Sequence, residues 1–324
     1  MQLKDNNNNK RMGIKYLNPF LIKYANDGIF SLNLDGDFFC NKTIIIDVSI
    51  YMYKFSEKNN LLENFHKLLM IFDENKIKPI FVFDGKPTDE KQKIINKRKE
   101  EKLIAKQKHD ELIKNYENNK DEYELFMLKK QFQHIRKTDF EKVKNILKLW
   151  NCPYIEAPNE ADIICLQLMK NETLKPVGCL TDDMDFIAFG SSFVFRQLNL
   201  VSKTVIVYDL QKIINQLKMT FEEFQDFICC CGVDYESKSL EEIEKIFELF
   251  QIYKKNECDT INFIEWYKLK TGEQPINIAI NDETTNYEEI VNKPIAIKNP
   301  IEYYNKKYQE ILLTEEGFIP IPKQ

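Results

Sequence analysis

Short apolar runs that end in an acidic residue are the feature that most restricts what this chain can fold into. Thr43–Ile46 leads directly into Asp47, and Pro79–Phe83 leads into Asp84. Val177–Thr181 is followed by a pair of aspartates. Continuous apolar runs of this length are typical of strands buried on both faces of a parallel α/β sheet. Such sheets bind ligands at the carboxyl ends of their strands, where these acids would gather.

Seven acidic residues in five short segments form a set that capping alone does not explain. A single aspartate after a strand usually caps a helix or forms a turn. Carboxylates gathered at one edge repel each other and raise each other's pKa, so they stay ionised only around divalent cations. The set therefore indicates a site for hard metal ions. Its members are Asp47, Asp84, Glu160, Asp162, Asp183, Asp185 and Asp234.

The composition is typical of a folded, intracellular protein. The 324 residues are 43% hydrophobic and include 23 Phe, enough for one large domain and a smaller appendage. No apolar run is long enough to span a bilayer and no apolar signal region opens the sequence, so we expect no membrane association. The formal charge of −5 argues against nucleic acid only as a sum, because the distribution of charge matters more than its total.

The eight cysteines do not follow a zinc or disulfide pattern. Three of them are consecutive, Cys229–Cys231, and the sequence contains no Cys-x-x-Cys pair. Cys165 and Cys179 stand in apolar contexts, which predicts small core side chains. A reducing compartment fits this usage best.

The periodicity of apolar residues predicts strands that alternate with helices, and one long charged region. Residues 86–138 are charged, helical in pattern and poor in apolar anchors. Beyond the strands already named, we expect strands at Tyr154–Glu156, Phe193–Phe195 and Val205–Tyr208. We expect helices at Leu61–Asn75, Pro158–Lys170, Phe221–Cys230 and Leu240–Phe250.

The segments around the acids resemble a known family. They read IIIDVSIYMYKF at 44–55, PIFVFDGKP at 79–87, PYIEAPNEAD at 153–162, TDDMDFIAFG at 181–190 and CGVDY at 231–235. In order and spacing they resemble the motifs of the flap endonuclease/XPG family of structure-specific 5′ nucleases. Residues 12–14 resemble the amino terminus of that family, and the resemblance extends to about Tyr235.

The resemblance implies an α/β fold of the PIN-like, 5′-nuclease type. A central, mostly parallel twisted sheet would be flanked by helices, with a helical arch and a small divergent C-terminal region. We expect a disordered tail at 1–11, a nuclease domain at 12–235 with its arch or gateway at about 86–138, and a C-terminal region at 236–324. Either Met12 is then the true start, or residues 1–11 must follow a path away from the site; the first is expected.

The resemblance also implies what the acids do. Glu160, Asp162, Asp183 and Asp185 would ligate metal directly, whereas Asp47, Asp84 and Asp234 would act partly through bound water. Two Mg²⁺ ions per site are expected, with Mn²⁺ as a substitute. Two such ions about 4 Å apart activate a water and stabilise the leaving oxygen of a phosphodiester. Carboxylate oxygens rather than His or Cys suit Mg²⁺.

Basic residues after the second acidic motif are candidates for handling the phosphate. Lys91 and Arg98 match the basic residues by which the family reaches the scissile phosphate, where they would stabilise charge in the transition state. Lys97 and Lys102 are candidate phosphate contacts. Spacings of seven and four residues put Lys91, Arg98 and Lys102 near one helical face. The alternative is a solvated helix face, as most charge runs are.

Two further residues are candidates for substrate binding. Tyr53 matches an aromatic residue that stacks on the base beside the cleaved bond, although a tyrosine there could equally belong to the core. Arg196 matches a basic position after the segment that contains Asp183 and Asp185.

The sequence departs from the family after Asp234. The family carries a glycine-rich helical hairpin there, which binds K⁺ and the duplex backbone, but this sequence has no glycine between Gly232 and Gly272. We therefore expect no K⁺ site and a weaker grip on duplex DNA. The C-terminal residues do not match the family's sliding-clamp box, so clamp binding is not expected, and we expect a monomer. A trimmed, Asn- and Lys-rich form resembles copies carried by large DNA viruses.

The expected function is Mg²⁺-dependent cleavage of flapped or branched DNA in replication, repair or recombination, in a nucleus or at a viral replication site. Three alternatives stay open: a 5′→3′ exonuclease, a junction resolvase, and a catalytically inactive DNA-binding scaffold on the same fold. Seven carboxylates argue against the scaffold, because they would repel phosphate without metal.

Overall fold

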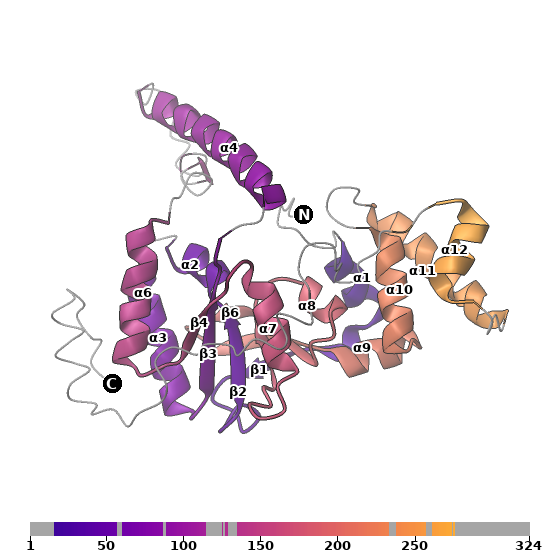
Figure 1. Ribbon diagram of the computed structural model, residues 1–324, viewed down its shortest axis with the longest axis horizontal. Coiled ribbons are helices and arrows are strands. Elements are labelled where there is room, and N and C mark those ends of the chain that lie inside the picture. The colour runs from indigo at the N-terminus through magenta and orange to yellow at the C-terminus, as the bar shows by residue number, and fades with distance from the viewer. Residues whose placement is uncertain are drawn as a thin grey trace. The chain divides into compact units, whose positions relative to one another are not determined.

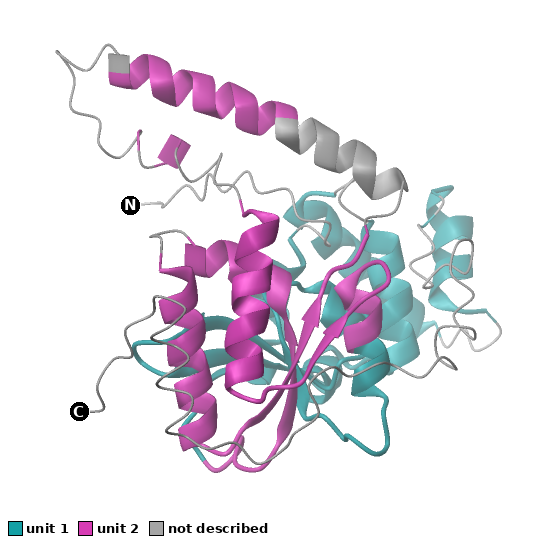
Figure 2. Cartoon of the chain, turned by 60° about the vertical axis from the view of Figure 1, so that its left-hand side comes forward, with its two compact units in different colours: residues 1–36, 166–294 teal, residues 37–165, 295–324 magenta. Residues whose placement is uncertain are grey.

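The computed structural model describes residues 16–56, 60–86, 89–114, 125, 127–128, 135–232, 238–256, 261–273 and 275, and of residues 89–99 and 114 the backbone alone (Figure 1). The predicted tail, Met12 and Asp234 lie outside these residues. The chain divides into two compact units (Figure 2). Unit 1 comprises residues 1–36 and 166–294, and unit 2 comprises residues 37–165 and 295–324.

Unit 2 is built on three parallel strands in the order β2-β3-β4. They are β2 (Thr43–Asp47), β3 (Lys78–Phe83) and β4 (Tyr154–Glu156). Every residue of β3 after Lys78 is buried, as are the last four of β2. This burial explains why both strands read as continuous apolar runs and confirms the strand predictions. Asp47 lies opposite Val82, so β2 and β3 end at the same edge.

Two helices of unit 2, α2 and α3, pack against β3. α3 packs against α2, α6 and β3, and it buries Phe65, Leu69 and Phe72 along one face. α4 is long and charged, as predicted. Of its described side chains Ala105 is buried, whereas Leu103 and Ile104 are more than half exposed. The helices are α2 (Val48–Ser56), α3 (Leu61–Glu74), α4 (Asp89–Lys114), α6 (Lys137–Leu149) and the first part of α7 (Ala161–Met169).

Unit 1 holds four strands in the order β1-β7-β6-β5. β5 and β6 are parallel, whereas β6–β7 and β7–β1 are antiparallel. With the two parallel pairings of unit 2, parallel pairs outnumber antiparallel ones, which confirms the predicted mixed, mostly parallel α/β class. The strands are β1 (Ile29–Asn33), β5 (Gly178–Leu180), β6 (Phe193–Asn199) and β7 (Thr204–Asp209).

The helices of unit 1 share an aromatic core. The ring of Phe20 in α1 lies 5.2 Å from Phe227 of α10 and 5.3 Å from Phe247 of α11, measured between ring centroids. Such pairs stabilise by about 0.5–1.5 kcal/mol each beyond their burial. The elements are α1 (Leu17–Tyr24), η1 (Asn26–Gly28), α8 (Asp185–Ala188), α9 (Leu210–Leu217), α10 (Phe221–Cys231), α11 (Leu240–Lys255) and α12 (Phe263–Thr271).

Helices α10, α11 and α12 each begin with a side-chain cap of their own. Thr220 at α10 and Ser239 at α11 each accept a hydrogen bond from the amide three residues on, and each forms a capping box with the glutamate there. At α12 the side chain of Asn262 accepts from the amide of Glu265, at 2.9 Å.

Of the four helices predicted from the sequence, two end within one residue of the prediction and two differ by more. The helix expected from Pro158 begins at Ala161, because the carbonyls of Pro158 and Asn159 accept hydrogen bonds from Lys86 and Gly85 of the loop after β3. α11 runs to Lys255 rather than to Phe250. Within the described segments, no helix is long and apolar enough to cross a membrane.

Candidate active site

Asp84, at the carboxyl end of β3, joins the acidic segments of unit 2. Its Oδ2 accepts a hydrogen bond from Ser49 Oγ at 2.5 Å, and its Oδ1 accepts from the amide of Ala161 at 2.8 Å. Ala161 stands between Glu160 and Asp162, which are both half-buried at the start of α7. The carboxylate of Asp84 is therefore attached to the segment that carries two other predicted ligands.

Gly85 makes this attachment possible. Its amide donates to the carbonyl of Asn159 at 2.6 Å. A Cβ at this position would lie 2.0 Å from the carbonyl oxygen of Ala157 and 2.6 Å from that of Pro158. Both neighbours are backbone atoms, so the loop after β3 approaches the loop before α7 closely only with glycine here.

Asp47 lies at the end of β2 and is only 4% exposed. A carboxylate so buried needs hydrogen bonds, a charge partner or a cation, because removing it from water is costly. Ser49, two residues further on, donates to Asp84, so the ends of β2 and β3 are linked through side chains. Ser49 was not singled out from the sequence, although it lies within the first acidic motif.

In unit 1, Asp183 lies on the loop between β5 and α8, and Asp185 is the first residue of α8. Asp183 donates its amide to Thr181 Oγ1 at 3.1 Å, and its Oδ1 accepts from the amide of Asp185 at 3.0 Å. Thr181 is fully buried and donates its own amide to the carbonyl of Phe195 in β6. Both aspartates are half-buried on a segment held by these contacts.

The chemistry of the donors fits Mg²⁺. The predicted ligands are Asp and Glu in unit 2 and Asp in unit 1, and their carboxylate oxygens are the ligands that a hard cation prefers. In the part of the chain that the structure describes, no three His, Cys, Asp or Glu side chains are grouped closely enough to hold an ion. Asp234 lies outside that part. The assignment of all seven acids to one metal site therefore stays a prediction.

The candidate substrate residues of unit 2 lie on α2 and α4. Lys102 Nζ is 5.3 Å from the ring centroid of Tyr53, whose side chain is 48% exposed. The structure describes only the backbone of Lys91, Lys97 and Arg98, which belong to α4 as predicted. Their side-chain roles stay predictions.

Arg196, the other candidate substrate residue, makes its contacts within unit 1. Its Nε donates to the carbonyl of Asp182 at 3.2 Å, and its Nη1 donates to Met184 Sδ at 2.8 Å. Its guanidinium carbon lies 5.2 Å from the centroid of the Tyr208 ring. Burial raises the pKa of Tyr208, and the nearby Arg196 opposes that rise.

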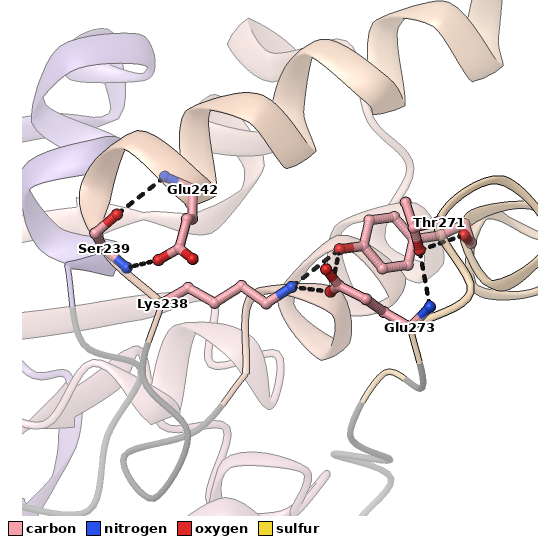
Figure 3. A network of polar contacts seen from close by, with 6 residues as sticks. Lys238, Ser239, Glu242, Thr271 and Glu273 are labelled. Atoms are coloured by element: carbon pink, nitrogen blue, oxygen red, sulfur yellow. Dashed lines mark hydrogen bonds and ion pairs between the residues drawn. The ribbon is translucent and has the colours of Figure 1, made fainter.

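A polar network lies beyond the last acidic motif, where the glycine-rich hairpin was expected to be missing (Figure 3). Lys238 Nζ contacts Glu273 and donates to the Tyr267 hydroxyl at 2.9 Å, and that hydroxyl donates to Glu273 at 2.7 Å. Burial raises the pKa of Tyr267 to about 12, although Lys238 opposes the shift. The hydrogen bond from Lys238 lowers the pKa of Glu273. The network ties the start of α11 to the end of α12.

Comparisons with known proteins identify two regions of the chain. The sequence profile of the XPG N-terminal domain matches residues 12–105, and that of the XPG I-region matches residues 151–234. Flap endonuclease 1 of Enterocytozoon bieneusi (strain H348) is 28% identical over 329 residues, which cover 87% of this chain and 89% of that protein.

Solved structures share the fold. The catalytic core of Rad2 in complex with a DNA substrate has a TM-score of 0.53 at 22% identity, with 95% of both chains covered. Flap endonuclease-1 from Methanococcus jannaschii has a TM-score of 0.52 at 18% identity, with 94% of this chain and 93% of that chain covered. The fold and the two matched regions define a DNA endonuclease. The chain belongs to the flap endonuclease/XPG family of structure-specific 5′ nucleases.

Proposed function

We propose that this protein cleaves flapped or branched DNA near the base of a 5′ single strand, with two Mg²⁺ ions held by its carboxylates. The observation that carries the proposal is the pair of hydrogen bonds to Asp84 from Ser49 and from Ala161. They join the acidic ends of two parallel strands to the segment that carries Glu160 and Asp162. Family membership supplies the reaction class.

The chain's own residues would bind and orient the substrate. The seven acids, Asp47, Asp84, Glu160, Asp162, Asp183, Asp185 and Asp234, would hold the ions. When bound, the ions supply Lewis-acid chemistry, which makes a water nucleophilic and stabilises the leaving oxygen. Lys91 and Arg98 would stabilise negative charge that develops on the scissile phosphate. Tyr53 would stack on a base, and Lys97 and Lys102 would contact phosphates, whereas Arg196 donates hydrogen bonds within the protein, to Asp182 and Met184.

The proposal also covers the oligomeric state of the protein and the place where it acts. The protein would act as a monomer on DNA in a nucleus, without a K⁺ site and without a sliding-clamp box. The polar network of Lys238, Tyr267 and Glu273 supports a C-terminal region that is folded without the family's hairpin.

The test compares cleavage of a 5′-labelled flap, a blunt duplex and a four-way junction, each with Mg²⁺ and with EDTA. Release of the intact flap strand, only with Mg²⁺, supports the proposal. Mononucleotides from the duplex would identify an exonuclease, and paired cuts in the junction would identify a resolvase. No cleavage of any substrate by folded protein would favour the scaffold.

A further inference from the structure

We infer that Asp182 and Arg196 are positioning residues, which hold the loop of residues 181–185 against strand β6. This loop carries Asp183 and Asp185, so the inference rests on the proposed function. Asp182 belongs to the same acidic string, but its carboxylate accepts from an amide of β6, whereas that of Asp183 accepts from the amide of Asp185 nearby in the sequence. Asp182 would therefore hold the loop in place, whereas Asp183 and Asp185 would bind the metal ions.

Asp182 is held through both its side chain and its main chain. Its Oδ1 accepts a hydrogen bond from the amide of Gln197 at 2.7 Å. Its carbonyl accepts from Nε of Arg196 at 3.2 Å. One residue earlier, the amide of Thr181 donates to the carbonyl of Phe195 at 3.0 Å. Three consecutive residues of β6 thus fix two consecutive residues of the loop.

An irregularity in β6 produces this geometry. The register between β6 and β7 shifts between Arg196 and Asn199, and Gln197 has a φ of 52°. Left-handed backbone costs a residue with a side chain about 1–2 kcal/mol. Such strain persists where the surroundings over-determine it, and bulges beside active sites often redirect a group. Here the redirected group is the Gln197 amide, which meets the carboxylate of Asp182.

Arg196 is held in place by a contact with Tyr208 of β7. Its guanidinium lies over the ring of Tyr208, which is only 2% exposed. The hydroxyl of Tyr208 donates to Oδ1 of Asn18 in α1 at 2.5 Å. The contacts therefore run from α1 through β7 and β6 to the loop, which limits how far the carbonyl of Asp182 can move.

The carboxylate of Asp182 contacts strand β6, whereas the carboxylate of Asp183 contacts the start of α8. The Oδ1 of Asp182 faces a backbone amide of β6, a contact that a neutral amide oxygen can also make. Proteins bind Mg²⁺ mainly through carboxylates, whose negative charge a neutral amide oxygen does not supply. Asp182→Asn should therefore keep the loop of residues 181–185 against β6, whereas Asp182→Ala should let the loop move away from it. Neither change removes a proposed metal ligand.

The first experiment measures Mn²⁺ binding without DNA, from the electron paramagnetic resonance signal of the free ion. We expect Asp182→Ala to weaken binding by about 10- to 100-fold, the usual effect of removing a partner that orients a metal ligand. Asp182→Asn should bind within about twofold of the parent, and Asp183→Asn should bind far more weakly. Equal losses in Asp182→Ala and Asp182→Asn would overturn the inference, as would parental binding by Asp182→Ala or no binding by the parent.

The second experiment separates positioning from DNA contact at Arg196. We expect Arg196→Lys and Arg196→Met to weaken Mn²⁺ binding, while the affinity for flap DNA in EDTA stays within about twofold of the parent. If Arg196 contacted phosphate, the results would be reversed. Arg196→Met would then bind flap DNA more weakly, and the slope of log Kd against log salt concentration would fall by about one. Its Mn²⁺ binding would equal that of the parent. These results would overturn the positioning role.

Arg196→Lys keeps the positive charge and the long stem, so it serves as the second variant where Arg196→Met fails to fold in a thermal unfolding assay. Failure of the proposed function has a different signature. The parent would then bind Mn²⁺ and show the ranking of Asp182 variants but cleave none of the substrates.

Discussion

The ammonium group of Lys102 in α4 lies over the ring of Tyr53 in α2, 5.3 Å from its centroid. The ring is half exposed, so a base stacked on Tyr53 and a phosphate bound by Lys102 could belong to neighbouring nucleotides. This pairing links the two candidate substrate residues whose side chains the structure describes in unit 2. It also makes their roles separable by experiment.

Tyr53→Ala should weaken binding of a single-stranded 5′ flap, whereas Tyr53→Phe should preserve it. Stacking on an aromatic side chain contributes about 1–3 kcal/mol per base, which corresponds to roughly 5- to 150-fold in Kd. Fluorescence anisotropy of a labelled flap in EDTA measures the change. Equal losses in both variants would show that the hydroxyl, rather than the ring face, makes the contact.

Lys102→Ala should lower the salt dependence of flap binding by about one, the contribution of one phosphate contact. The measurement is the slope of log Kd against log salt concentration. Lys245→Ala removes the same charge from an exposed position of α11 and serves as the control. A slope that changes equally in both variants would reflect net charge alone.

Asp183→Ala should reduce cleavage by roughly a thousandfold or more, because bound metal contributes several kcal/mol to the transition state. Folding and much of the affinity for DNA should be preserved. Initial rates on a 5′-labelled flap measure the effect, and Asp35→Ala, an exposed acid of unit 1, is the control. Full activity of Asp183→Ala would refute the metal assignment at this residue.

Gly85→Ala should destabilise unit 2 by about 1–3 kcal/mol, the usual cost of forcing extra atoms into a packed site. The added Cβ would meet the carbonyl oxygens of Ala157 and Pro158. Urea unfolding followed by circular dichroism measures the loss. Lys86→Ala changes the exposed neighbour and keeps the amide that bonds Pro158, so it should unfold like the parent.

His66 should make the protein less stable in acid. It is 4% exposed, packs 5.2 Å from the Trp150 ring, and burial lowers its pKa below the ordinary value of 6.5. The unfolded chain therefore binds a proton at His66 more readily than the folded chain does. The contribution of neutral His66 to the free energy of unfolding is complete above pH 6.5 and falls as the pH drops towards the folded-state pKa.

The measurement for His66 is the midpoint of thermal unfolding between pH 7.5 and 5.5. His66→Phe should show a smaller fall in this midpoint across the pH range than the parent. If the midpoint of thermal unfolding of His66→Phe fell as much as that of the parent, a group other than His66 would cause the loss of stability in acid.

Continuous burial explains why the strands of unit 2 could be predicted. β2 and β3 are covered on both faces, so their apolar runs were visible without knowledge of their partners. β1 was missed because its residues are only half-buried or exposed, and it pairs with β7, which follows about 170 residues later in the sequence. α2 was missed because it follows Asp47 with no intervening turn residue.

The candidate site could be predicted as residue types but not as contacts. The motifs indicated which acids matter, including Asp84 and Asp183. They did not indicate that Asp84 accepts hydrogen bonds from Ser49 and Ala161, because that depends on two loops approaching across Gly85. The contact between Asp182 and Gln197 depends on a bulge in β6, and no local sequence pattern predicted that bulge.

The caps of α10, α11 and α12 have a consequence for how this region can change over time. Thr220, Ser239 and Asn262 each start a helix through contacts within the next three residues. Within the described residues no cap relies on a distant segment, so residues could be inserted or lost between 256 and 261 while α12 still began at the same residue. The stretch between 232 and 238 carries the proposed ligand Asp234, so the proposed site constrains its length. The length of the connection from α11 to α12 can thus evolve independently of the two helices that it joins.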